Sequence, residues 1–370
     1  LSYQALQQLG AKTALLGTVA KRIGNDILPS SLTTADPIEI ADDMQQMLKA
    51  GATHLVMEVS SHALDQLRTK GISFDVAVFT NLSHDHLDYH KNFTDYARSK
   101  KKLFDSLKSD ATAVINGDDK KAQSMVADCQ AEVVTFSFSS TEGLSCHISH
   151  NNTNGLSLQI GHTPVESPLI GEFNAYNIAE AFLICRALGF ESQAIASALK
   201  LATGAEGRME KVASSANQPL VLVDYAHTPD ALKNVLKTLT ELKTDRQKLH
   251  VIFGCGGDRD KSKRPQMAAI AETYAGRITV TSDNPRSEDP GAIIDDIMAG
   301  FENQSAIKRI TDRKAAITET IRHADAQTII LIAGKGHETY QEVDGKRLDF
   351  DDRQVARQAL ENGNLKSVES

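Results

Sequence analysis

The sequence predicts an α/β fold made of two domains. With 370 residues, the chain is too long for one typical hydrophobic core. Short β-rich runs alternate with amphipathic helical segments along its whole length, which is typical of parallel sheets covered by helices. A new alternating series starts near Gly207, so we expect one domain over residues 1–206 and a second over residues 207–370.

Composition excludes several classes of protein. The net charge of −8 argues against a nucleic-acid partner, because such proteins usually carry a basic surface. No apolar run approaches the roughly 20 residues that a membrane span needs. The four cysteines lack CxxC spacing, so neither a zinc site nor a disulfide framework is indicated. We therefore expect a cytoplasmic protein with no membrane span.

In the first domain, the first 17 residues indicate the end of a helix running into a strand, as if the chain began partway through a domain. Asp36-Pro37 should cap a helix with an apolar stripe of Ile40, Met44, Met47 and Leu48. Strands are expected over 54–59, 75–79, 113–116 and 133–136, an antiparallel insertion over 142–168, and a helix over 174–188.

In the second domain, Thr228-Pro229 should begin a helix whose apolar stripe comprises Leu232, Val235, Leu236, Leu239 and Leu242. Strands are expected over 220–223, 249–253, 278–281 and 328–333.

Unusual polar residues follow six of the predicted strands. Ligands of open α/β sheets bind beyond the carboxyl ends of the strands. Each domain should therefore carry a binding region, and the two regions could face each other across a cleft. The six segments are Glu58–His62, Thr80–His86, Asp224–His227, Gly254–Arg259, Asp283–Arg286 and Gly334–Glu338.

The segment His84–His90 contains three histidines and two aspartates. These residue types can bind a metal, but such a loop can equally cap a helix, and the spacing leaves both readings open. Glu58 adds a hard oxygen ligand at a neighbouring strand end, which favours Mg²⁺ over zinc.

Lys100 falls on the apolar stripe of the helix that follows His90, whereas Lys101 and Lys102 point elsewhere. A buried lysine readily becomes a neutral amine, which can react with CO₂ to give a metal-binding carbamate. The alternative, favoured by the residues alone, is a lysine that extends its ammonium group from the helix edge into water. The stripe comprises Phe93, Tyr96, Ala97, Leu103, Phe104 and Leu107.

The glycine-rich segments do not form a phosphate-binding loop, because no GxxxxGK[ST] motif occurs in the sequence. Arg259 and Arg286 instead accompany Asp283 and Glu338. Arginine forks suit a carboxylate and acidic groups suit an ammonium, so this set could bind an amino acid. A surface ion-pair network would give the same charges.

Several strings, in this order, resemble the Mur ligase family, and within it the branch that adds diaminopimelate. The resemblance runs from Leu32-Thr33-Thr34 to Gly334–Glu338 and implies an incomplete central ATPase domain followed by a Rossmann-like C-terminal domain. The strings are EVSSHALDQLR (58–68), TNLSHDHLDYH (80–90), GEFNAYN (171–177), GRME (207–210), DYAHTPDAL (224–232) and GCGGDRDKSKRP (254–265).

The resemblance implies a role for particular residues. Glu58, His86 and a carbamylated Lys100 match catalytic and magnesium-binding positions, which reverses the preference for an extended Lys100. Positions for the UDP-muramoyl-dipeptide are Thr33, Thr34, Ser60, Gln66 and Arg68. Positions for the nucleotide are Asn174, Asn177, Arg208, Asp224 and His227. Positions for the amino acid are Arg259, Asp283, Asn284, Pro285, Arg286, Gly334 and Glu338.

The activity implied is ATP-dependent ligation of meso-diaminopimelate to UDP-N-acetylmuramoyl-L-alanyl-D-glutamate by a monomer, with ATP and Mg²⁺. The family's GTxGKT loop would lie upstream of Leu1, so the resemblance implies a truncated chain without ligase activity of its own. Three alternatives remain: a lysine-adding relative, an enzyme similar to folylpolyglutamate synthase, and a non-catalytic remnant that binds an amino acid or a protein partner.

Overall fold

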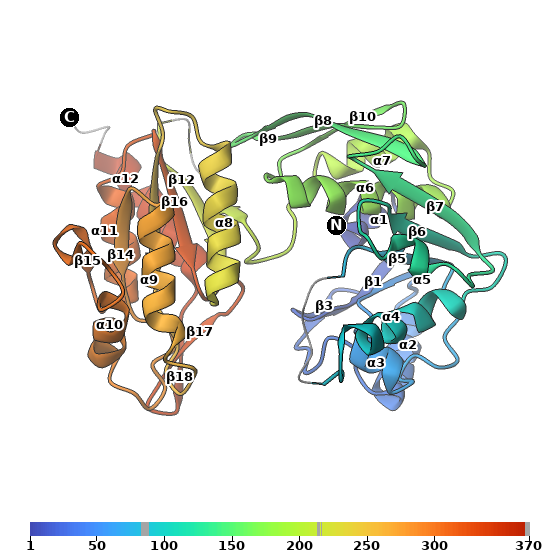
Figure 1. Ribbon diagram of the computed structural model, residues 1–370, viewed down its shortest axis with the longest axis horizontal. Coiled ribbons are helices and arrows are strands. Elements are labelled where there is room, and N and C mark those ends of the chain that lie inside the picture. The colour runs from blue at the N-terminus through green and yellow to red at the C-terminus, as the bar shows by residue number, and fades with distance from the viewer. Residues whose placement is uncertain (83–88, 213–214, 216, 367–370) are drawn as a thin grey trace. The chain divides into compact units, whose positions relative to one another are not determined.

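A computed structural model of the chain describes residues 1–82, 89–212, 215 and 217–366 (Figure 1). The chain divides into two compact units, Leu1–Thr203 and Gly204–Ser370. In the described part of the chain, no helix is long and apolar enough to cross a membrane.

The first unit begins with a small sheet whose strands follow the order β3-β2-β1-β4. Strands β1 and β4 are parallel neighbours, and helix α2 packs its buried Ile40 and Met47 inward. Asp36 caps α2 and Pro37 is its first residue, as predicted. Leu48 is 73% exposed, so its place in the predicted stripe was wrong. The small sheet buries only a narrow face of the helix. The elements are α1 (Ser2–Gln8), β1 (Thr13–Leu16), β2 (Lys21–Ile23), β3 (Asp26–Leu28), α2 (Pro37–Lys49) and β4 (His54–Met57).

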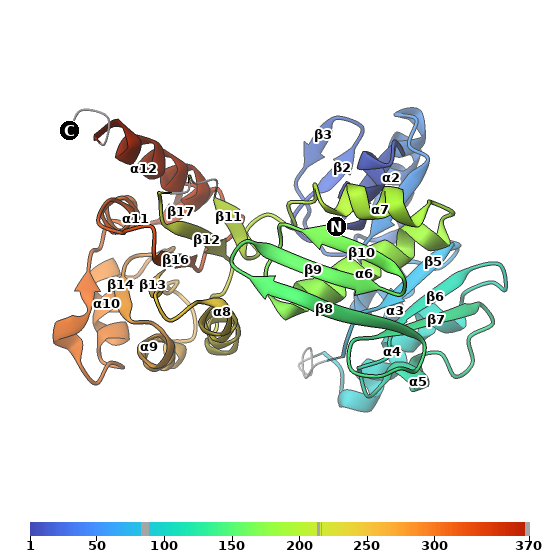
Figure 2. The same cartoon turned by 90° about the horizontal axis from the view of Figure 1, so that it is seen from above.

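A second sheet of this unit follows the order β10-β9-β8-β7-β6-β5 among the described residues. Neighbours from β5 to β8 are parallel, whereas β8, β9 and β10 form the antiparallel insertion that the sequence predicted (Figure 2). The elements are α3 (Ser61–Asp65), β5 (Val76–Phe79), α4 (Phe93–Asp105), β6 (Thr112–Asn116), α5 (Ala122–Met125), β7 (Glu132–Ser137), β8 (Leu144–Asn152), β9 (Gly155–Ile160), β10 (Thr163–Ser167), α6 (Glu172–Ala187) and α7 (Ser192–Leu199).

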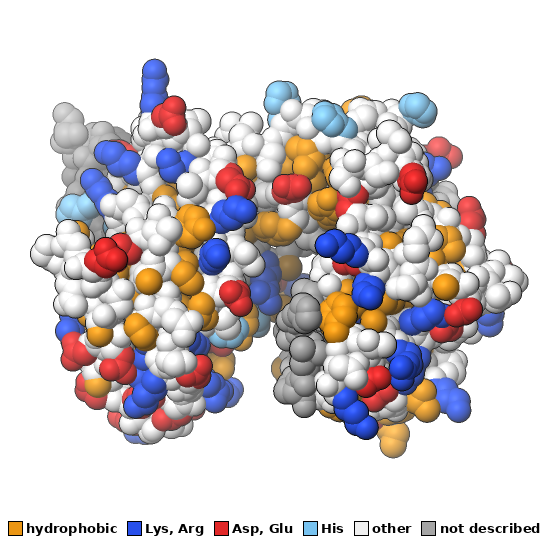
Figure 3. Space-filling model, viewed as in Figure 1, with side chains coloured by type: hydrophobic (Ala, Val, Ile, Leu, Met, Phe, Trp, Pro, Cys, Tyr) orange, Lys and Arg blue, Asp and Glu red, His pale blue; other side chains and the backbone are white. Residues whose placement is uncertain are grey.

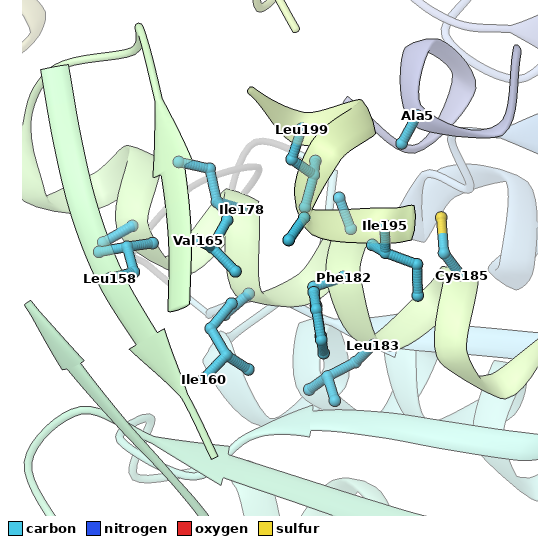
Figure 4. Packing of buried hydrophobic residues seen from close by; sticks show 14 of the residues in the cluster. Ala5, Leu158, Ile160, Val165, Ile178, Phe182, Leu183, Cys185, Ile195 and Leu199 are labelled. Atoms are coloured by element: carbon cyan, nitrogen blue, oxygen red, sulfur yellow. The ribbon is translucent and has the colours of Figure 1, made fainter. Parts of the chain in front are cut away.

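The largest core of the first unit lies between α6, α7, α1 and the inner face of the antiparallel strands (Figure 4). Phe182 and Ile178 of α6 point toward Ile160 and Val165, and Ile195 and Leu199 of α7 close the far side. Apolar burial of this kind supplies most of the stabilisation of a domain. It fixes α6, and therefore the asparagines at its start.

The second unit is a mainly parallel sheet with helices on both faces (Figure 2). Its order is β11-β12-β16-β13-β14-β15 among the described residues, with only β11 antiparallel to its neighbour. The elements are β11 (Glu210–Val212), β12 (Leu220–Asp224), α8 (Pro229–Leu242), β13 (Lys248–Phe253), α9 (Lys263–Tyr274), β14 (Arg277–Val280), α10 (Pro290–Met298), η1 (Gln304–Ala306), β15 (Lys308–Arg309), α11 (Arg313–Arg322), β16 (Thr328–Ala333), β17 (Tyr340–Val343), β18 (Lys346–Asp349) and α12 (Asp352–Lys366).

A buried ion pair joins the ends of strands in the second unit. Arg313 and Asp352, at the starts of α11 and α12, are both fully buried, with their closest atoms 2.7 Å apart. Arg313 also donates hydrogen bonds to the carbonyl oxygens of Ser282, at 3.3 Å, and Ala333, at 3.0 Å. One guanidinium group therefore fixes the chain where it leaves β14 and β16.

We expect Arg313→Met to destabilise the second unit by about 3–5 kcal/mol, because the substitution leaves Asp352 buried without a partner. Unfolding in denaturant measures this loss. The control is Lys308→Met, which removes an exposed partner of Glu319 and should cost less than about 1 kcal/mol. Equal effects of the two substitutions would contradict the role given to the buried pair.

Glu180 of α6 should make the first unit less stable as the pH rises. Burial raises the pKa of its carboxyl from 4.5 to about 8. The folded state therefore keeps a proton that the unfolded state loses above pH 4.5, and stability falls from there up to about pH 8. Glu180→Gln should remove this slope and stabilise the protein at pH 8 by on the order of several kcal/mol. The exposed Glu172 of the same helix provides the control, Glu172→Gln, which should leave the slope unchanged.

Candidate active site

Glu58 lies directly after β4 and contacts the loop that follows β1. Its Oε2 accepts a hydrogen bond from the backbone N–H of Thr18 at 3.1 Å and a second from the Thr18 hydroxyl. The hydroxyl of Thr33 lies 3.1 Å from the hydroxyl of Thr18. Because β1 and β4 are parallel, both loops leave the same edge of the sheet. Thr18 belongs to none of the motifs that the sequence indicates.

The other residues predicted for the dipeptide lie beside Glu58. Thr34 donates to the carbonyl oxygen of Glu58 at 2.9 Å and accepts from the backbone N–H of Ser60 at 3.0 Å. Arg68 donates to the carbonyl oxygen of Thr34 at 2.8 Å and to the side chain of Gln66 at 2.9 Å. The structure therefore brings Thr33, Thr34, Ser60, Gln66 and Arg68 together around one strand end.

Lys100 is half-buried on α4, and its Nζ lies 5.5 Å from the centre of the Tyr96 ring. Its two neighbours point elsewhere, as predicted: Lys101 pairs with Asp105 and Asp128, and Lys102 pairs with Asp65. The environment of Lys100 is therefore partly apolar, as the stripe indicated.

The predicted metal site is only partly visible. His86 and the rest of segment 83–88 lie outside the described residues. His90 is buried, and its Nε2 lies 2.9 Å from the hydroxyl of Ser61. Among the residues that the structure describes, no group of three or more His, Cys, Asp or Glu side chains is arranged to hold a metal. The carboxylate of Glu58 and the hydroxyl of Thr18 bring oxygen atoms together here, and oxygen is the type of ligand that Mg²⁺ prefers.

Asn174 and Asn177 lie in the first two turns of α6. The amide of Asn174 donates to the carbonyl oxygen of Ile170 at 2.8 Å, and the amide of Asn177 donates to Asn174 at 3.1 Å. Asn177 is exposed, whereas Asn174 is buried. The pair is therefore held in a fixed orientation at the start of the helix.

The other residues predicted for the nucleotide belong to the second unit. Asp224 ends β12 and accepts hydrogen bonds from the backbone N–H groups of Met209 and Ala226, at 2.7 and 2.8 Å. Burial raises the pKa of its carboxyl, although these two donors act in the opposite direction. The guanidinium of Arg208 lies 5.0 Å from the centre of the Tyr225 ring, and Nδ1 of His227 lies 2.9 Å from the Tyr225 carbonyl oxygen.

The loops after β13 and β14 touch each other through glycine. A Cβ on Gly257 would lie only 1.9 Å from the carbonyl oxygen of Pro285. Arg286 donates to the carbonyl oxygen of Gly257 at 2.8 Å. A Cβ on Gly256 would lie 2.9 Å from Nη1 of Arg286 and 3.9 Å from Cγ of Arg259. Both predicted arginines therefore have side-chain atoms close to Gly256.

A carboxylate holds these two loops together. Glu288 accepts from the backbone N–H of Asp258 at 2.7 Å and from the buried guanidinium of Arg264 at 2.9 Å. The Arg264 guanidinium, together with this N–H group, lowers the pKa of Glu288 to about 2. Asp258 in turn accepts from the hydroxyl of Ser287 at 2.7 Å.

Buried charges gather where β14 and β16 end. Asn284 donates to Glu338 at 2.9 Å, and the fully buried Lys335 donates to Asn284 at 2.9 Å and to Glu338 at 3.1 Å. A Cβ on Gly334, where φ is +120°, would lie 2.5 Å from Oδ2 of Asp283. Lys335 is not among the predicted site residues, although its neighbour Gly334 is and it stands three residues before Glu338.

Charged side chains of both signs are interspersed over each unit on the face shown in Figure 3. Several buried charges, among them Asp224, Asp283 and Lys335, lie at strand ends, where burying them costs free energy unless they are paired. Side chains with perturbed surroundings at strand ends of an α/β sheet are typical of an enzyme's ligand site.

The fold and the two sites are those of a ligand-binding α/β enzyme. Residues 1–185 match the Mur ligase middle domain, and residues 207–336 match the Mur ligase glutamate ligase domain. The chain belongs to the Mur ligase family, and it is an ATP-dependent ligase of the class that forms C–N bonds.

Close relatives carry one name. The chain is similar to the UDP-N-acetylmuramoyl-L-alanyl-D-glutamate--2,6-diaminopimelate ligase of Cytophaga hutchinsonii, 41% identical over 363 residues, covering 98% of this chain and 74% of the relative. The enzyme of that name from Chromobacterium violaceum is 42% identical over 366 residues, covering 96% and 73%. The comparisons therefore confirm the predicted family, and they give no support to the expectation that these residues are inactive.

Solved structures agree with the predicted fold class. A structure of UDP-N-acetylmuramoyl-L-alanyl-D-glutamate--2,6-diaminopimelate ligase is 37% identical, with a TM-score of 0.75, covering 98% of this chain and 75% of that one. A folylpolyglutamate synthase from Mycobacterium tuberculosis is 20% identical, with a TM-score of 0.62, covering 90% and 84%, and shares the fold alone.

We expect Gly257→Ala to destabilise the second unit by about 1–3 kcal/mol, because the added methyl group collides with the backbone of Pro285. Denaturant unfolding provides the measurement. Gly276→Ala is the matched control, since its Cβ would lie 3.9 Å from the nearest neighbour, an ordinary contact. An equally small effect of both substitutions would show that the two loops are free to separate.

Proposed function

We propose that the protein ligates meso-diaminopimelate to UDP-N-acetylmuramoyl-L-alanyl-D-glutamate in peptidoglycan synthesis, with ATP as the energy source. The observation that carries this proposal is that Arg259 and Arg286 both lie near Gly256, while Asn284, in the same loop as Arg286, donates to Glu338. Relatives that share about two fifths of the sequence are named for this reaction. The reaction is cytoplasmic, and we propose a monomer as the active form.

The second unit supplies the amino-acid pocket. Arg286 offers a guanidinium fork whose Nη1 is already held by Gly257, which limits its movement. The fork suits the distal carboxylate of diaminopimelate, and Glu338 suits an ammonium group. Asp283 and Gly334, which are in close contact, would form the base of this pocket. Arg259 and Pro285 complete the proposed lining.

The first unit supplies the site for the acceptor peptide. Thr33, Thr34, Ser60, Gln66 and Arg68 would hold the muramoyl-dipeptide, since hydroxyl, amide and guanidinium donors suit its carboxylate and peptide groups. Glu58, with His86 and a carbamylated Lys100, would hold Mg²⁺. The bound cation would offset negative charge on the transferred phosphate.

Each unit carries residues proposed for the nucleotide. Asn174 and Asn177 present amides from α6, and Arg208, Asp224 and His227 surround Tyr225 in the second unit. Asparagine amides can pair with a base or hold phosphate oxygens, and arginine suits phosphate. No GxxxxGK[ST] loop occurs in the 370 residues, so the residues named here would contact the rest of the nucleotide.

The reaction follows two steps in this proposal. A D-glutamyl carboxylate oxygen attacks the γ-phosphorus of ATP, which gives an acyl phosphate and releases ADP. The amine of diaminopimelate then attacks the acyl carbon, loses a proton and expels phosphate as the amide forms. The side chains contribute by positioning the reactants, which can supply a large part of the rate enhancement.

Lysine is the main competing amino acid. It lacks the distal carboxylate, so it would not form the charge-assisted hydrogen bond that diaminopimelate could form with the Arg286 guanidinium, whose Nε lies 3.6 Å from Glu342. We therefore favour diaminopimelate over lysine as the substrate.

Calorimetric titration tests this choice. The protein should bind meso-diaminopimelate at least tenfold more tightly than lysine, and Arg286→Met should remove most of that preference. The control is Arg309→Met, which alters an exposed arginine paired with Asp295 and should change neither affinity. Equal affinity of the unaltered protein for both amino acids would disprove the choice. ADP release that requires the nucleotide-dipeptide and diaminopimelate together would demonstrate ligation.

A further inference from the structure

Lys335 is fully buried, so it does not reach a ligand, yet it contacts two residues of the proposed amino-acid pocket. Its Nζ donates to Oδ1 of Asn284 and to Oε2 of Glu338. Asp283 lies 3.9 Å from the same nitrogen, and the Tyr340 ring centre lies 5.4 Å away. Lys335 is therefore the central cation beneath the pocket.

The contacts of Asn284 fix the orientation of its amide. Oδ1 lies 2.9 Å from Nζ of Lys335 and 3.0 Å from the backbone nitrogen of Glu342. A lysine ammonium and a backbone N–H group can only donate, so the atom that faces them must be the amide oxygen. Both lone pairs of Oδ1 are then used, and the NH₂ group faces Glu338.

This orientation determines what the pocket offers to a ligand. One hydrogen of the Asn284 NH₂ group binds Oε2 of Glu338, which leaves the second hydrogen for a ligand. Oε2 of Glu338 accepts from both Asn284 and Lys335, which leaves Oε1 as the atom that can accept from a ligand. The pocket therefore presents one neutral donor and one anionic acceptor side by side.

We propose that Lys335 is a specificity-determining positioning residue, which locks Asn284 as a hydrogen-bond donor so that the pocket selects a carboxylate over a carboxamide on the incoming amino acid. The assignment rests on the proposed function and deepens it. A carboxylate can only accept at neutral pH and matches the remaining N–H, whereas a carboxamide can turn its own NH₂ group toward an amide that is free to rotate.

The test compares two ligands for the 370-residue protein by calorimetry: meso-diaminopimelate, and the same compound with its distal carboxyl converted to an amide. The unaltered protein should prefer the diacid at least tenfold. Lys335→Met should lower this ratio several-fold, because Oδ1 of Asn284 then loses one of its two donors and the amide is held less firmly by the Glu342 N–H and by Glu338. Lys335→Gln keeps a donor toward Oδ1 and should restore most of the ratio. A merely structural role for Lys335 would weaken both ligands equally and leave the ratio unchanged.

Thermal unfolding of each variant checks that it folds. Asn284→Asp provides a second test that keeps a partner for Lys335, and it should reduce the ratio because it replaces the N–H with an acceptor. An unchanged ratio in Lys335→Met, or in Asn284→Asp where the first variant does not fold, overturns the role of Lys335 and leaves the proposed function standing. Failure of the unaltered protein to bind either ligand overturns both.

Discussion

The buried pair of Arg313 and Asp352 is the interaction on which the second site depends. Strands β14 and β16 lie on either side of β13, and one guanidinium group binds carbonyl oxygens of the chain segments where both end. Asp352, at the start of α12, neutralises that guanidinium, and both side chains are fully buried. Every residue proposed for the amino acid follows β13, β14 or β16. The positions of these residues therefore depend on the contacts of Arg313.

Charge balance gives the pocket its chemistry. Asp283 and Glu338 would repel each other in a buried position, but Lys335 lies between them and Arg313 lies beneath. Buried ions are tolerated when they are paired and hydrogen-bonded, and removing one partner exposes the full cost of the other. The same network that stabilises the loops therefore also decides which atoms of Asn284 and Glu338 stay available.

In the first unit, uncharged groups bind the carboxylate at the strand end. The backbone N–H and hydroxyl of Thr18 donate to the Glu58 carboxylate, and the Thr34 hydroxyl donates to the Glu58 carbonyl oxygen. Both hydrogen bonds from Thr18 go to Oε2 of the Glu58 carboxylate, so Oε1 takes no part in them. Such a carboxylate is suited to a hard cation, whereas the second unit, rich in fixed cations, is suited to an anionic ligand.

The sequence by itself determined the class of fold, the family and most of the elements. Periodicity and capping located α2 and α8, because Asp36-Pro37 and Thr228-Pro229 act on their own nearest neighbours. Strand lengths were less accurate: the strand expected over 54–59 ends at Met57, since hydrogen bonds to β1 define its end. The spacing of apolar residues places Leu48 on the buried face of α2, but Leu48 is exposed. The width of the helix face that is buried depends on the size of the facing sheet, which the spacing does not show.

Only the tertiary structure decided which residues work together. The sequence named Asn284 and Glu338, which are 54 positions apart, but it could not show that Lys335 joins them or that the Glu342 backbone fixes the amide. It named Glu58 but not the Thr18 donor 40 positions earlier. Helix caps and apolar periodicity depend on residues that are close together in the sequence, so they can be predicted from it. A hydrogen-bond network between strand ends depends on which strands become neighbours in the sheet, and that order exists only once the chain has folded.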